Sequence, residues 1–113
     1  MKKSKEKKWK DFEFELFGTK WKVIFIDKVK ETEEMYLMGN CSYVSGTIWV
    51  ATQDNEGNPL KEEAVRINML HELTHSILDT GGYNNSSNDE PLVEWIARCL
   101  NSLLKQNVFD YAK

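Results

Sequence analysis

The sequence predicts an α+β fold, in which a small, mainly antiparallel sheet of three to four strands packs on a buried helix and on a second, C-terminal helix. Three observations indicate this fold. Strand-like segments fill the first half of the chain, an apolar helical segment follows them, and another helical segment with an apolar stripe comes near the end. The chain has 113 residues, 41% hydrophobic and 29% charged, which are the size and composition of one soluble folded domain.

The strands are predicted from alternation and from β-forming residues. Apolar residues alternate with glutamates over residues 12–16, and residues 21–26 are rich in β-formers. Residues 35–43 and 47–51 are predicted to form two more strands, joined by a hairpin turn with Gly46. The polar stretch between the second and third strands is expected to be a loop or a short helical turn.

The first helix is predicted to start at Asn58 and Pro59. Asparagine can cap a helix, and proline at the first helical position gives up no hydrogen bond. Over residues 60–79 the apolar side chains lie on almost all sides of the helix, so we expect neighbours on more than one face. The Gly81–Gly82 pair ends the helix.

The second helix is predicted to open at residues 89–91, after a polar loop at 83–88. We expect its apolar stripe to be buried; the stripe consists of Leu92, Trp95, Ile96, Cys99, Leu100, Leu103 and Leu104.

The charge is unevenly distributed. The first ten residues hold six lysines and one glutamate, whereas the whole chain has a net charge of −3. We therefore expect residues 1–10 to be a flexible basic arm and residues 11–113 to be a single domain. The acidic body argues against nucleic-acid binding as the main activity. No apolar run suits a membrane span or a secretory signal, so we expect a cytoplasmic protein without a membrane partner.

The two histidines of the chain, His71 and His75, flank Glu72 in an H-E-x-x-H motif within the buried helix. Side chains four residues apart share a helix face, so both imidazoles can converge on one ion. Zinc accepts imidazole nitrogens in a tetrahedral arrangement. Glu72 would face a metal-activated water as general base and then pass the proton to a leaving amine. The motif therefore predicts a Zn²⁺ site.

A catalytic zinc site keeps three protein ligands and one open position. Because no third histidine and no nearby cysteine exist, the third ligand is expected to be a carboxylate. Glu90 and Glu94, one turn apart on the second helix, are both candidates. Glu90 lies closer to the buried edge of the stripe, and the first turn of a helix favours a carboxylate.

The HELTH motif, followed by a short linker and a helix with a glutamate, resembles the gluzincin group of zinc metallopeptidases. The chain's small size is similar to that of the ImmA/IrrE-type peptidases of bacteria and mobile elements, and of short metallopeptidase-like proteins encoded by phages and prophages. Residues 90–97 are similar to the E-x-x-A-N-x-F-A segment of the ImmA/IrrE type. This similarity implies that Glu90 is the metal ligand and that Glu94 orients a histidine. The 18 residues between His75 and Glu94 resemble instead the spacing of larger gluzincin aminopeptidases, in which Glu94 would be the ligand. We prefer Glu90.

The resemblance implies a minimal zincin-like metallopeptidase that hydrolyses a peptide or protein substrate. Tyr83 is a candidate donor to the oxyanion. The chain lacks the asparagine of the ImmA/IrrE pattern at position 94 and an appended domain, which puts repressor cleavage in doubt as its role. The resemblance also implies an edge strand along which an extended peptide lies, formed by Thr47, Ile48, Trp49, Val50 and Ala51.

A different class of function stays open. With 113 residues there is little material for a second subdomain to wall a cleft. The same scaffold is therefore also compatible with a non-catalytic, metal-stabilised binding or regulatory module. The sequence does not predict an oligomeric state.

Overall fold

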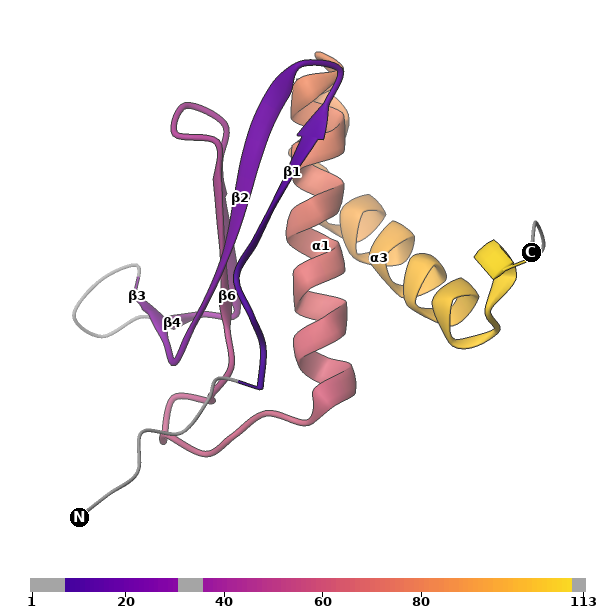
Figure 1. Ribbon diagram of the computed structural model, residues 1–113. Helices are drawn as coiled ribbons and strands as arrows, with labels where there is room; N and C mark the ends of the chain where they lie inside the picture. The colour runs from indigo at the N-terminus through magenta and orange to yellow at the C-terminus, as the bar shows by residue number, and fades with distance from the viewer. Residues whose placement is uncertain (1–7, 31–35, 111–113) are drawn as a thin grey trace.

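The computed structural model describes residues 8–30 and 36–110 and has the predicted α+β fold. Helix α1 stands between the sheet and α3, and α3 extends away from the sheet (Figure 1). The elements are β1 Phe12–Leu16, β2 Thr19–Ile26, β3 Val29–Lys30, β4 Tyr36–Leu37, β5 Gly39–Ser42, β6 Thr47–Ala51, α1 Glu62–Thr80, α2 Asn84–Ser87, α3 Glu90–Lys105 and the 3₁₀ turn η1 Val108–Asp110.

The main sheet has four strands in the order β1-β2-β6-β5. β1 pairs with β2 and β5 with β6 in antiparallel fashion, whereas β2 and β6 are parallel, with Ile24 opposite Trp49. The prediction that Thr47–Ala51 is an edge strand is therefore wrong. β6 is hydrogen-bonded on both sides because the chain returns from β2 to a parallel neighbour, and this places β5 at the end of the sheet.

The predicted strand over residues 35–43 is two short strands. β4 pairs with β3 in a separate two-stranded sheet, and β5 belongs to the main sheet, with Met38 between them. β3 lies where a loop or helical turn was expected, and residues 31–35 lie outside the described residues. The predicted turn is confirmed, since Gly46 has φ 63° and its N–H donates to the carbonyl of Tyr43.

The core lies between the sheet and α1. Its buried side chains come from alternate positions of β2, from β6 and from the first turns of α1: Trp21, Val23, Phe25, Ile48, Val50 and Val65. Trp21 Nε1 also donates to Thr80 Oγ1 at 3.1 Å, which ties β2 to the end of α1. Trp9 stacks on Phe25 with ring centroids 5.5 Å apart, so part of the predicted arm packs on the domain. Residues 1–7 of that arm lie outside the described part of the chain.

Helix α1 starts later than predicted. Its N-cap is Lys61, without a side-chain cap, and Pro59 instead forms an isolated bridge with Gln53. Asn58 does not cap the helix because Asp54 holds its backbone: Asp54 Oδ1 accepts the N–H of Asn58 at 2.9 Å, and the N–H of Asp54 donates to the carbonyl of Asn58. The segment before α1 is therefore a closed turn. The end of the helix at Gly81 is as predicted.

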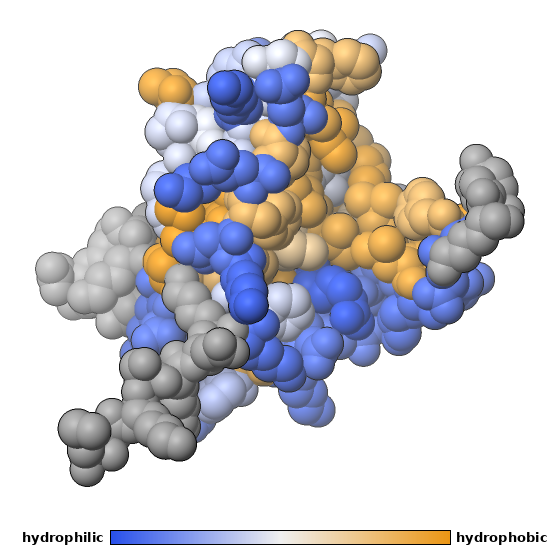
Figure 2. Space-filling model, viewed as in Figure 1, coloured by the Kyte–Doolittle hydropathy of each residue, from blue (hydrophilic) through white to orange (hydrophobic). Residues whose placement is uncertain are grey.

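Helix α3 docks on α1 through a different face from the predicted one. Its buried residues are Val93, Ala97 and Asn101, whereas Trp95 is 65% exposed and Phe109, in the following turn, is 60% exposed. Apolar residues cover much of the visible surface over α3 (Figure 2). The predicted stripe is therefore only partly buried, because the face of α3 that docks on α1 is centred on Val93 and Ala97.

Two further features complete the fold. The predicted loop at residues 83–88 contains the one-turn helix α2, which returns the chain from α1 to α3. Within the described residues, no helix is long and apolar enough to cross a membrane.

Candidate metal centre

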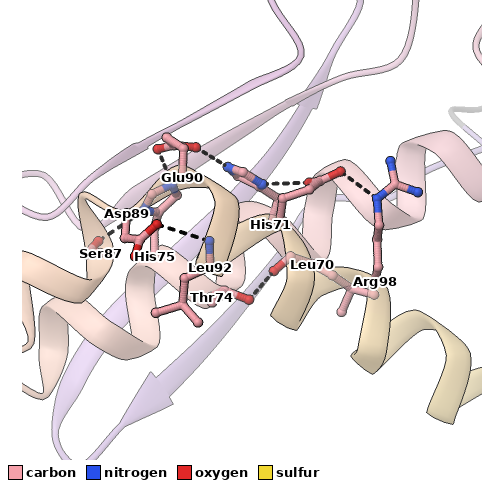
Figure 3. Close-up of polar contacts among 10 residues, drawn as sticks. Leu70, His71, Thr74, His75, Ser87, Asp89, Glu90, Leu92 and Arg98 are labelled. Atoms are coloured by element: carbon pink, nitrogen blue, oxygen red, sulfur yellow. Dashed lines mark hydrogen bonds and ion pairs between the residues drawn. The ribbon is translucent and has the colours of Figure 1, made fainter.

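His71 and His75 project from adjacent turns of α1 toward Glu90 in the first turn of α3. His71 Nε2 lies 2.9 Å from Glu90 Oε2, and His75 Nε2 lies 3.1 Å from Glu90 Oε1. Figure 3 shows the Glu90 carboxylate reaching both imidazoles, which come from the other helix. One ligand atom from each residue lies within 4.8 Å of the others, so the three residues form a group that could hold a metal ion.

The start of α3 fixes the position of Glu90. Asp89 is the N-cap, and its Oδ1 accepts the N–H of Leu92 at 3.2 Å, while Pro91 occupies the first turn. Both features define the helix start. The linker from α1 through α2 is short enough to bring this start back beside the histidines. Glu90 is thus presented by a helix terminus rather than by a free loop.

The second nitrogen of each imidazole also has a partner. His71 Nδ1 lies 2.9 Å from Glu94 Oε1, and His75 Nδ1 lies 3.0 Å from Ser87 Oγ. Glu94 in turn accepts a hydrogen bond from Arg98 Nε at 2.8 Å. Metal-binding histidines commonly have their other nitrogen held in this way, which fixes ring orientation and tautomer. Of the two predicted third ligands, Glu90 meets the converging Nε2 atoms, whereas Glu94 contacts the outer nitrogen of His71.

The donor set fits a divalent cation. If His71 donates its Nδ1–H to Glu94, its Nε2 presents a lone pair to the Glu90 carboxylate, and two acceptors at 2.9 Å need a proton or a cation between them. Tetrahedral zinc with bonds of about 2.0–2.1 Å places its ligand atoms about 3.3 Å apart. The two imidazole nitrogens lie 2.9 and 3.1 Å from different oxygens of Glu90, and one ligand atom from each of the three residues lies within 4.8 Å of the others.

Glu72 lies beside this group on α1 and is only 8% exposed. Burial raises the pKa of Glu72 to about 7, with His71 lowering it and Glu90 raising it by smaller amounts. Burial likewise lowers the pKa of His75 and favours the neutral imidazole, which is the form that ligates metals. A Cβ atom added at Gly39 of β5 would lie 2.8 Å from Glu72 Cγ and 2.8 Å from Glu72 Oε2. The carboxylate thus packs directly on the backbone of β5.

A cleft of about 640 Å³ opens over these residues. Its walls come from β5 and the residue before it, from one face of α1, and from α2 and the start of α3. The lining residues are Met38, Gly39, Asn40, Cys41, Asn68, His71, Glu72, His75, Asp79, Ser87, Asn88, Glu90 and Glu94.

Two sets of predicted site residues are not in this cleft. Tyr83 is 64% exposed and is not among the lining residues; an added Cβ on Gly81 would lie 3.0 Å from its ring. Thr47–Ala51 lie inside the sheet and also do not line the cleft. The structure therefore brings Glu72 and Glu94 together with the three residues that could hold a metal ion. It leaves the predicted oxyanion donor and the predicted peptide strand outside the cleft.

Four residues of the site were not predicted from the sequence. Arg98 could have been found, because it follows Glu94 by four residues on one helix face. Ser87 and Gly39 contact site residues from other elements, and Asn68 shares a face of α1 with His71 but lies outside the H-E-x-x-H motif. Cys41 lines the cleft as well, but burial raises its pKa to about 12, so it is no thiolate nucleophile near neutral pH.

Comparison of the chain with known protein families, with curated proteins and with solved structures finds no match. The site therefore stands on its own geometry: a His-His-Glu group that could hold a metal ion, on one side of a polar cleft.

Proposed function

We propose that the protein is a small, gluzincin-like metallopeptidase that uses zinc to hydrolyse a peptide or protein substrate. The observation that carries this proposal is the convergence of His71, His75 and Glu90 in a cleft that also contains the buried carboxylate of Glu72. Two imidazoles and a carboxylate, next to a further carboxylate that is not needed as a ligand, are the donor set of a catalytic zinc site.

Each residue has a distinct task in this proposal. His71, His75 and Glu90 hold the ion, and Glu94 and Ser87 keep the imidazoles oriented. When bound, zinc supplies a Lewis acid that polarises the scissile carbonyl and activates water. Glu72 accepts a proton on its carboxylate and delivers it to the nitrogen of the leaving amine.

The outer edge of β5, which pairs with no further strand among the described residues, is the surface on which we place the peptide. β5 is the last strand of the main sheet, and Gly39, Asn40 and Cys41 of this strand line the cleft. An extended peptide can add to such an edge through main-chain hydrogen bonds. This strand takes the role that the sequence analysis gave to β6.

One observation favours a second candidate, a metal-stabilised binding module without catalysis. Tyr83, the predicted oxyanion donor, is largely exposed and does not line the cleft. A site without an additional donor can hold a metal and bind a peptide without hydrolysing it at a useful rate.

The test compares zinc-loaded wild type with Glu72→Gln on a mixture of unstructured peptides, with bound zinc measured in both. We expect cleavage by the wild type, a rate lower by about 10²- to 10⁴-fold in Glu72→Gln, and one zinc per chain in each. Equal residual rates in the two proteins would contradict catalysis and support the binding module. Absence of zinc in the wild type would contradict both candidates.

A further inference from the structure

Asn68 carries a buried donor that the fold does not use. The residue lines the cleft, and its Nδ2 is the one buried side-chain nitrogen or oxygen without a hydrogen-bond partner in the part of the chain that the structure describes. An unpaired buried amide is destabilising, and native proteins retain few of them. A ligand in the cleft that accepts a hydrogen bond from Asn68 Nδ2 would satisfy this donor.

The position of Asn68 on α1 relates it to the reacting centre. It precedes His71 by three residues and Glu72 by four, so all three share a face of the helix. With a rise of about 1.5 Å per residue, Asn68 lies about 4.5 Å from His71 and about 6 Å from Glu72 along the axis. An extended peptide advances about 3.3 Å per residue. Asn68 is therefore one to two peptide residues away from the bond at the metal group.

The charges of the cleft indicate which acceptor suits this donor. Among the described residues, the lining includes four carboxylates, those of Glu72, Asp79, Glu90 and Glu94, and no lysine or arginine. Even with a divalent cation bound and Glu72 protonated, the formal charge of these groups is negative, so an anionic acceptor, such as the C-terminal carboxylate of a peptide, is disfavoured there. A neutral carbonyl oxygen has no net charge and is not repelled by these carboxylates. A peptide paired with β5 along one edge also turns the carbonyl of every second residue away from β5, where it needs a donor.

We propose that Asn68 is a substrate-binding residue whose Nδ2–H donates to an internal backbone carbonyl of the peptide, one or two residues from the bond that is hydrolysed. The terminal torsion of asparagine is soft, so the amide can turn toward this oxygen when the peptide enters. The proposal rests on the proposed function and narrows its substrate class to internal peptide bonds.

The experiment uses two hydroxamates on the zinc-loaded protein. Acetohydroxamate binds through the metal alone, whereas an N-acetyl-dipeptide hydroxamate adds backbone carbonyls one and two residues away. The variant Asn68→Leu keeps the size of the side chain and removes the donor. We expect it to weaken the dipeptide hydroxamate by about 3- to 10-fold, the effect of one neutral hydrogen bond, and to leave acetohydroxamate unchanged. With a cleaved peptide, KM should rise more than kcat falls.

Stability provides the second readout. Because Asn68→Leu removes an unpaired buried amide, its midpoint of thermal unfolding should equal or exceed that of wild type. Asn85→Leu, at an exposed asparagine of α2 outside the cleft, is the matched control and should change neither binding constant. Should Asn68→Leu fold poorly, Asn68→Asp, which keeps the shape and replaces the amide donor by an acceptor, replaces it in the binding measurements and should weaken the dipeptide hydroxamate selectively.

Two outcomes would contradict the proposals, one the role of Asn68 alone and the other the proposed catalytic site as well. Equal affinity of the dipeptide hydroxamate together with an equal KM for a cleaved peptide, in wild type and in the Asn68 variant, refutes the role of Asn68 and leaves the metal centre intact. If acetohydroxamate fails to bind zinc-loaded wild type, the ion has no open position for a ligand, the proposed catalytic site is refuted, and the role of Asn68 is refuted with it.

Discussion

The carboxylate of Glu72 packs on the backbone of Gly39, so closely that a Cβ atom at Gly39 would lie 2.8 Å from Glu72 Oε2. This distance is shorter than real Cβ contacts, and the same Cβ atom would also lie only 3.0 Å from the backbone carbonyl oxygen of Trp49. Glycine is required here for space, since its φ is not positive. Strand β5 thereby sets where the proposed general base can lie.

Gly39→Ala is therefore expected to displace the Glu72 carboxylate and to lower kcat/KM for peptide hydrolysis by about 10- to 100-fold, because a displacement of about 1 Å in a catalytic group has effects of this size. Bound zinc should stay at one per chain, since no metal candidate touches Gly39. Gly81→Ala is the matched control: its Cβ would meet the ring of the exposed Tyr83, which can move, and would make an ordinary contact of 3.5 Å with the carbonyl oxygen of Ile77. An unchanged rate in Gly39→Ala would show that Glu72 is not held by this contact.

The different contacts of Glu90 and Glu94 predict different effects on metal affinity. Glu90→Ala removes a carboxylate that meets both Nε2 atoms and should reduce zinc binding to the level of His71→Ala. Glu94→Ala removes only the partner of His71 Nδ1 and should lower the affinity by about 10- to 100-fold. Competition with a chromogenic chelator measures both constants. The reverse order of effects would identify Glu94 as the ligand.

The thiol of Cys41 predicts a pH dependence. Burial, with smaller contributions from Glu72 and Asp79, raises the pKa of Cys41 from 9.0 to about 12 in the folded protein. The folded state thus favours the neutral thiol, so its contribution to stability is complete below pH 9 and is lost as the pH rises from 9 toward 12. In a Cys99→Ser background, alkylation of Cys41 by iodoacetamide at pH 8 should be at least about 100-fold slower in buffer than in urea.

The pH dependence that Cys41 predicts can also be measured in unfolding experiments, with Cys41→Ala as the control. The free energy of unfolding should fall more steeply with pH, between pH 9 and 11, in the parent protein than in Cys41→Ala. Equal slopes, or rapid alkylation of the native protein, would mean that the Cys41 side chain is open to solvent.

The difference in burial between Trp95 of α3 and Trp21 of β2 predicts which of the two tryptophans stabilises the fold. Trp95 is 65% exposed, so Trp95→Gln should change the free energy of unfolding by less than about 0.5 kcal/mol. Trp21 is 1% exposed and bonds Thr80, so Trp21→Phe, the matched aromatic position in the core, should lose at least about 1 kcal/mol. Urea unfolding measures both. A large loss in Trp95→Gln would mean that the apolar stripe is buried in solution.

Local patterns predicted which segments form strands and helices better than they predicted which elements pair with one another. Alternation over β1 and β2 and the apolar helix α1 were recognisable because period 2 and period 3.6 are properties of the segment itself. The interior place of β6 depends on its parallel pairing with β2, which no segment encodes alone. The cap at Asn58 failed for a related reason: the carbonyl of a cap residue accepts the first helical hydrogen bond, but the carbonyl of Asn58 accepts the backbone N–H of Asp54 instead.

The candidate site also contains residues that a local pattern predicted and residues that it did not. The spacing of His71, Glu72 and His75 places them on one helix, so the motif sufficed to predict them. The choice between Glu90 and Glu94 needed the docking angle of α3, because one helical turn separates them and both can approach the histidines. Polar contacts such as Arg66 Nε to Asn101 Oδ1 at 2.7 Å also join the two helices, and an apolar stripe does not predict them.

Small side chains and polar pairs, rather than a broad apolar interface, join α3 to α1, and the start of α3 is attached through Glu90 and Glu94. The atoms that would bind a cation are thus among those that hold the two helices together. A ligand that binds only the folded arrangement stabilises it by mass action. Cation concentration should therefore control how firmly this helix pair is closed, and a chelator should act on the tertiary structure and on the chemistry through one and the same equilibrium.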